Sequence, residues 1–102
     1  MADRTLRHVV LLRFRADASD AAKQTVHNAL TALPGKIPEI QRYQFGDDAG
    51  LVEGHADFAI VAEFANEADF ETYAKHPDHQ AAIAETIRPI VEQRTALQYW
   101  ID

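Results

Sequence analysis

The order of its secondary-structure patterns is what most constrains the fold of this chain. Strand, helix, strand is followed by strand, helix, strand within 102 residues. Alternating apolar residues predict four strands, at residues 6–15, 40–45, 58–64 and 95–101. This order suits a four-stranded antiparallel sheet with the helices on one face, the ferredoxin-like α+β arrangement βαββαβ. The length allows one domain, residues 1–102.

The helices are predicted from their caps and breakers. Ser19 is a good N-cap for a helix from Asp20 to Leu33, which Pro34 and Gly35 should end. Asn66 caps a second, short helix, and a last helix begins at Asp78.

Apolar residues on both faces of the strands predict a partner for the sheet. In the first strand, one alternating set is apolar apart from His8, and the other is apolar at its centre, Val9 and Leu11. Val61 and Trp100 lie on the corresponding second faces of their strands. Because helices cover one face only, a monomer would expose these residues as an apolar patch. We therefore expect a homodimer with two-fold symmetry, closed sheet against sheet, with Trp100 in the interface.

The segment Tyr73-Ala74-Lys75-His76-Pro77-Asp78-His79 gathers a phenol and two imidazoles around a proline. Pro77 lacks an N–H and disfavours helix at the residue before it, so the chain turns a corner here. Tyr73 then lies in the last turn of one helix and His79 in the first turn of the next, so their side chains can face each other. The helix dipole helps to keep His79 neutral, and a neutral imidazole near pH 7 acts as a base.

Other interpretations of this corner stay open. Tyr73 and both histidines also fit a capped helix junction with solvated imidazoles. A metal site is a third interpretation, although Pro77 breaks the register of His76 and His79 and no third ligand is evident. We predict no metal and no cofactor. His8, alone among apolar neighbours, is more typical of a hydrogen-bonded core histidine than of a catalyst.

Composition excludes several classes of function. Sixteen acidic and ten basic residues give a net charge of −6, which argues against nucleic-acid binding. No apolar run approaches a membrane span of about 20 residues, and no secretion signal is evident. The chain contains no cysteine, so thiol chemistry is excluded. A cytoplasmic location fits these features.

The chain resembles the stress-responsive A/B barrel, or Dabb, domain family. The matching features are the strand His8-Val9-Val10-Leu11-Leu12, the strand from Phe58 to Phe64, the corner motif Tyr73-x-x-His76-Pro77-x-His79 and the final Ile101-Asp102. The resemblance implies a dimeric α+β barrel. It also implies a small apolar, phenolic or polyketide-like ligand held between helices and sheet.

One branch of this family consists of cofactor-free plant polyketide cyclases. The resemblance of this chain to that branch implies roles for single residues. Tyr73 would polarise a substrate carbonyl and His79 would take the proton, as in a cyclase or lyase. The residues implied to line the same cavity are His8, Val10, Val26, His27, Leu30, Phe58 and Ile83. Phe58 departs from that branch, where the cyclases carry a histidine. Two alternatives are a non-catalytic, stress-related dimeric assembly protein and a cofactor-free monooxygenase.

Overall fold

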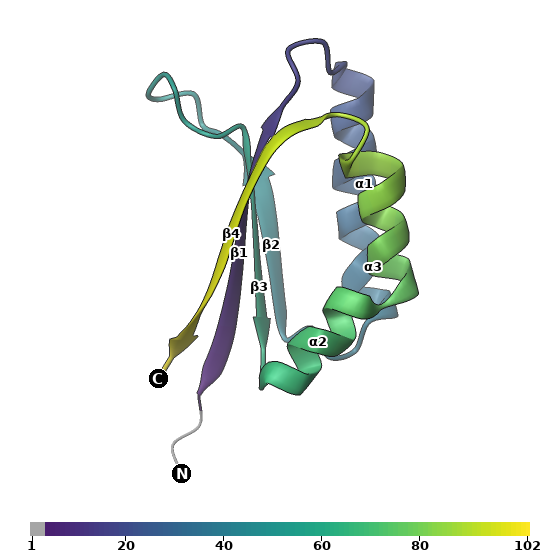
Figure 1. Ribbon diagram of the computed structural model, residues 1–102, viewed down its shortest axis with the longest axis vertical. Coiled ribbons are helices and arrows are strands. Elements are labelled where there is room, and N and C mark those ends of the chain that lie inside the picture. The colour runs from purple at the N-terminus through teal and green to yellow at the C-terminus, as the bar shows by residue number, and fades with distance from the viewer. Residues whose placement is uncertain (1–3) are drawn as a thin grey trace.

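The computed structural model describes residues 4–102, which form one sheet layer and one helix layer (Figure 1). The elements are β1 (Thr5–Phe14), α1 (Asp20–Lys36), β2 (Arg42–Asp47), β3 (Phe58–Phe64), α2 (Glu67–Lys75), α3 (Pro77–Ala82), the π-helical turn η1 (Ile83–Ile87) and β4 (Val91–Ile101). The sheet order is β2-β3-β1-β4, and all neighbouring strands are antiparallel. The helices lie on one face of the sheet (Figure 1). The predicted ferredoxin-like α+β fold is confirmed.

The helix-facing side of the sheet carries the hydrophobic core. Its members include alternate residues of β1 and β3 and one stripe of α1: Val10, Leu12, Phe14, Phe58, Ile60, Phe64, Val26, Leu30 and Leu33. His8 shares this side and is only 5% exposed. Burying a polar ring in such a core requires a hydrogen-bond partner, and Gln98 of β4 supplies one.

Helix α1 begins where the sequence predicts and ends later. The Ser19 hydroxyl accepts a hydrogen bond from Ala22 N at 3.1 Å, as expected of an N-cap. The predicted end at Pro34 is wrong, because the helix continues to Lys36 with Pro34 inside its last turn. The continuation of the helix to Lys36 places Ile37 in the core, where it is fully buried. Among residues 4–102, no helix combines the length and hydrophobicity that a membrane crossing requires.

The chain turns the predicted corner between α2 and α3. Asn66 Oδ1 accepts from Asp69 N at 2.8 Å and caps α2. His76 leaves the helical conformation before Pro77, and its Nδ1 accepts from Asp78 N at 3.1 Å, which caps α3. His76 is therefore a capping residue.

The bounds of three strands differ from the prediction, and β1 lies one residue earlier than expected. β2 lies two residues later than expected, and β4 begins at Val91 rather than Thr95. The polar run from Glu92 to Arg94 hides the start of β4 in the sequence. In the fold, Arg94 pairs with Leu12 of β1, so its side chain is on the helix-facing side.

The other face of the sheet, which we call the open face, has no helix over it (Figure 1). Val9, Leu11, Val61 and Leu97 lie at its centre, as the register of β1 with β3 and β4 requires. Leu11 is 40% and Leu97 is 55% exposed. The open face is therefore apolar and unpartnered in a single chain.

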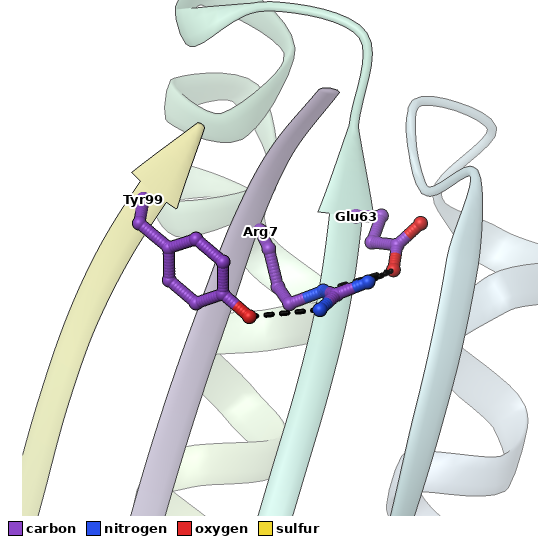
Figure 2. Close-up of polar contacts among 3 residues, drawn as sticks. All are labelled: Arg7, Glu63 and Tyr99. Carbon is purple, nitrogen blue, oxygen red and sulfur yellow. Dashed lines mark hydrogen bonds and ion pairs between the residues drawn. The ribbon is translucent and has the colours of Figure 1, made fainter. Parts of the chain in front are cut away.

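A polar row crosses one end of the open face (Figure 2). Arg7 of β1 donates to Glu63 Oε2 of β3 through Nε at 3.1 Å and through Nη2 at 2.9 Å. Its Nη1 donates to the Tyr99 hydroxyl of β4 at 2.8 Å. The row fixes the side chains of three strands at the margin of the apolar centre.

Trp100 is not on the open face, so its predicted place in the sheet-against-sheet interface is wrong. It pairs with Leu6, a buried helix-facing residue of β1. Its ring borders a groove beside Phe70 of α2, and the Arg4 guanidinium lies 4.5 Å from its centroid. The more apolar alternate set of β4, which includes Leu97, points to the open face instead.

Candidate functional site

A cavity of about 40 Å³ lies between the helices and the sheet. Apolar side chains form most of its wall: Val10, Leu12, Leu30, Ile60, Ala82, Ile83 and Ile87. Five polar side chains also line it: His8, Tyr43, Tyr73, His79 and Arg94. The volume suits about three water molecules or a small organic group. An apolar cavity with a few convergent polar groups is the usual form of a small-molecule site.

Tyr73 and His79 face each other across the corner. Their ring centroids are 4.0 Å apart, and Tyr73 is 2% exposed. His79 Nδ1 lies 3.2 Å from the Ala74 carbonyl oxygen. Since a carbonyl only accepts, Nδ1 carries the proton in this bond, and the lone pair of the neutral ring is on Nε2. His79 thus offers a basic nitrogen that its hydrogen bond does not use.

Burial keeps His79 in the neutral form. Loss of solvent lowers its pKa, and the charge of Arg94 and the neighbouring His76 act weakly in the same direction. The hydrogen bond to Ala74 opposes this change but does not reverse it. Dehydration thus outweighs the other contributions, and at neutral pH the ring is available as a base.

Two tyrosine hydroxyls meet at the cavity. Tyr43 Oη of β2 and Tyr73 Oη of α2 are 3.0 Å apart. Burial raises the pKa of both phenols, so both stay protonated at neutral pH. One hydroxyl donates to the other, and the acceptor keeps its own O–H. The pair therefore always has one proton to offer to a ligand.

His8 is held in the opposite tautomer to that of His79. The Gln98 side-chain amide lies 2.7 Å from His8 Nδ1. With Gln98 Nε2 donating, Nδ1 accepts and the ring proton is on Nε2. Burial, aided by the charge of Arg94 and by His79, lowers the His8 pKa to about 4. His8 is therefore a neutral hydrogen-bond donor beside the basic His79.

The structure brings together six of the nine residues that the sequence analysis assigned to the site. Tyr73, His79, His8, Val10, Leu30 and Ile83 line the cavity. Val26 and Phe58 are buried in the core outside its lining. His27 borders a different surface depression, where its ring packs on Phe58 and Nε2 lies 3.2 Å from Asp47 Oδ1.

Two polar side chains of the cavity lining, Tyr43 and Arg94, were missed in the sequence. Tyr43 lies in a strand of mixed polarity, and no local pattern links it to Tyr73, which is 30 residues away. Arg94 lies in the polar run that concealed the start of β4. Side chains alternate between the two faces of a strand, so this alternation identifies both residues as helix-facing once the strand register is known. Among residues 4–102, no three His, Cys, Asp or Glu side chains gather as metal ligands would.

This chain belongs to the stress-responsive A/B barrel domain (Dabb) family, which it matches over residues 6–101. It is 39% identical to a dimeric ferredoxin-like protein of unknown function from Thermobifida fusca, with a TM-score of 0.90, over 97% of this chain and 92% of that one. It is 31% identical to a dimeric ferredoxin-like protein of unknown function from Bacteroides fragilis, with a TM-score of 0.81, over 95% and 96% of the two chains.

A more distant structure carries an activity in its name. Hydroxynitrile lyase from Passiflora edulis is 22% identical, with a TM-score of 0.86, over 99% of this chain and 96% of the lyase. At this identity the likeness concerns the fold. A comparison with curated protein sequences finds no significant match.

Proposed function

We propose that this protein binds a small carbonyl or hydroxy compound in the cavity and catalyses proton transfer on it without a cofactor. One observation carries the proposal: the neutral imidazole of His79, with an unused basic nitrogen, lies against the buried Tyr73, whose hydroxyl pairs with that of Tyr43 and leaves one proton to donate. A positioned base and a hydrogen-bond donor are what a reaction at a carbonyl requires. A purely structural core would be better served by apolar side chains at these positions.

The reaction type that this arrangement fits is reversible cleavage of a carbon–carbon bond next to a hydroxyl group. His79 Nε2 takes the hydroxyl proton, the carbon–carbon bond breaks, and its electron pair leaves with the departing carbon. The imidazolium returns the proton to that carbanion, which yields a carbonyl compound and a neutral second product. Tyr73 or Tyr43 donates to the carbonyl oxygen throughout. The activity named for the Passiflora protein is of this type, which supports the proposal.

The size of the cavity narrows the substrate class. Sites for drug-sized ligands occupy about 300–1,000 Å³. The cavity of about 40 Å³ is much smaller. We therefore favour a small carbonyl compound over the polyketide-like molecule that the family resemblance implies.

We infer that the chain forms a homodimer through the open face. The relatives from Thermobifida fusca and Bacteroides fragilis are described as dimeric. The open face has an apolar centre, Val9, Leu11, Val61 and Leu97, that a second sheet would bury. The loop between β2 and β3 also projects to this side (Figure 1), and its Leu51 is 86% exposed.

A binding and turnover experiment tests the proposed activity. Purified protein is titrated by NMR with small hydroxynitriles, aldols and their aldehydes, and carbonyl formation is followed by absorbance. We expect binding and turnover that Tyr73→Phe and His79→Ala reduce at least about ten-fold. Tyr99→Phe is the matched control, because it removes a tyrosine hydroxyl on the open face. Equal loss in Tyr99→Phe, or no binding by any compound, would contradict the proposal.

A further inference from the structure

The strand β4 places a guanidinium at the candidate site. Arg94 pairs with Leu12, and both side chains line the cavity. Arg94 is itself exposed, whereas Tyr73 and His8 are buried. Arg94 therefore lies where the cavity meets solvent, and the tyrosines and His8 lie deeper.

The guanidinium of Arg94 is not committed to a structural contact. Within residues 4–102, the hydrogen bonds and ion pairs of arginine side chains involve Arg4, Arg7, Arg13 and Arg15, and none involves Arg94. A guanidinium has five N–H donors in a planar fork that matches a carboxylate. Arg94 thus has its full donor capacity available to a ligand.

The charge of the cavity favours an anion. No Asp or Glu is among the described residues that line it, although the whole chain has a net charge of −6. His8 and His79 are neutral, so Arg94 supplies the positive charge of the lining. That charge already acts on the deeper groups, since it contributes to the low pKa values of both histidines. An anion bound at Arg94 would meet no opposing carboxylate in the wall.

We propose that Arg94 binds the carboxylate of the ligand, so that the substrate class is a small carboxylic acid with a hydroxyl or carbonyl group beside the acid. The proposal rests on the function proposed above and adds a specificity-determining residue. The guanidinium would hold the carboxylate at the mouth, and the neighbouring hydroxyl or carbonyl group would then reach Tyr73 and His79. Two-carbon and three-carbon acids fit the small volume and serve as binding probes of this acid subsite. The cleavage itself requires a longer acid, in which the departing carbon is a stabilised carbanion.

Acid and amide pairs test this inference. The probes are pyruvate with pyruvamide and lactate with lactamide, each titrated by NMR into the wild type, Arg94→Gln, Arg94→Lys and Tyr73→Phe. Arg88→Gln is the matched control, because Arg88 is an exposed arginine outside the cavity lining. Thermal unfolding of each variant verifies its fold.

We expect the wild type to bind each acid about ten- to a hundred-fold more tightly than its amide, which is typical of a charged hydrogen bond. Arg94→Gln should abolish this preference, Arg94→Lys should keep part of it, and Arg88→Gln should keep all of it. Tyr73→Phe should weaken acid and amide alike. If acids and amides bind equally, or if Arg94→Gln retains the preference, the inference is wrong while the proposed function stands. If neither class binds and hydroxynitriles and aldols also fail, both are overturned.

Discussion

Leu97 and Trp100 provide a sharp test of how this sheet is used. They are three residues apart on the same edge strand, and both are large, apolar and about half exposed, at 55% and 41%. Leu97 pairs with Val9 on the open face, whereas Trp100 pairs with Leu6 on the helix-facing side. If the open face is the dimer interface, a glutamate at Leu97 should dissociate the dimer and a glutamate at Trp100 should not.

The magnitude follows from burial. Fully burying a leucine side chain contributes about 1.5–3 kcal/mol, so covering the exposed half of Leu97 contributes about 1 kcal/mol per protomer. Two-fold symmetry doubles this to about 2 kcal/mol per dimer. Leu97→Glu removes that contribution and also places two carboxylates in an apolar interface, which costs several kcal/mol more. The total is at least about 4 kcal/mol, so the dissociation constant should rise at least about a thousand-fold.

Sedimentation velocity over a range of protein concentrations measures this change. The wild type and Trp100→Glu should sediment as dimers at concentrations where Leu97→Glu sediments as a monomer. Circular dichroism verifies that each variant is folded. A Leu97→Glu protein that sediments like the wild type would refute the placement of the interface, as would a Trp100→Glu protein that dissociates equally.

Three further predictions concern single chains. Tyr73→Phe should lower the free energy of unfolding by about 1 kcal/mol, because it removes one hydrogen bond between partly buried hydroxyls, as urea titration will measure. A loss of several kcal/mol would make Tyr73 a structural residue. Asn66→Ala should cost about 1 kcal/mol and increase amide exchange in α2, since the cap on Asp69 N is lost. His8 has a pKa of about 4 in the folded chain and 6.5 in the unfolded chain. As the pH falls, the unfolded chain therefore takes up this proton at a higher pH than the folded chain does. Stability should therefore fall by about 3 kcal/mol as pH drops from 6.5 to 4, and His8→Gln should abolish that part of the pH dependence.

Local rules predicted the parts of this structure that depend on neighbours in sequence. The core set of β1, the caps at Ser19 and Asn66, and the meeting of Tyr73 with His79 each follow from residues within one strand, one helix end or one corner. Steric effects and capping act over a few residues, so these features can be predicted from the local sequence.

The pairing register of the strands could not be predicted from the sequence. The strand at 95–101 has two alternating sets, and the more apolar set was assigned to the helices. Pairing with β1 places Leu97 on the open face and Gln98 and Trp100 on the other. The same long-range pairing brings Tyr43 and Arg94 to the cavity. A shift of one residue exchanges the two faces, and no local pattern specifies it when both sets are partly apolar.

The pleat of the sheet separates the candidate cavity from the proposed dimer interface at the level of single residues. His8 and Val9 are adjacent in β1, yet one lines the cavity and the other lies on the open face. On β4, Leu97 lies on the open face, and the adjacent Gln98 hydrogen-bonds His8 from the helix-facing side. Because one chain supplies the described cavity lining, a monomeric Leu97→Glu protein should still bind the ligand of the wild type. If its affinity fell in parallel with dissociation, the partner subunit would have to complete the site, and the single-chain account of the chemistry would fail.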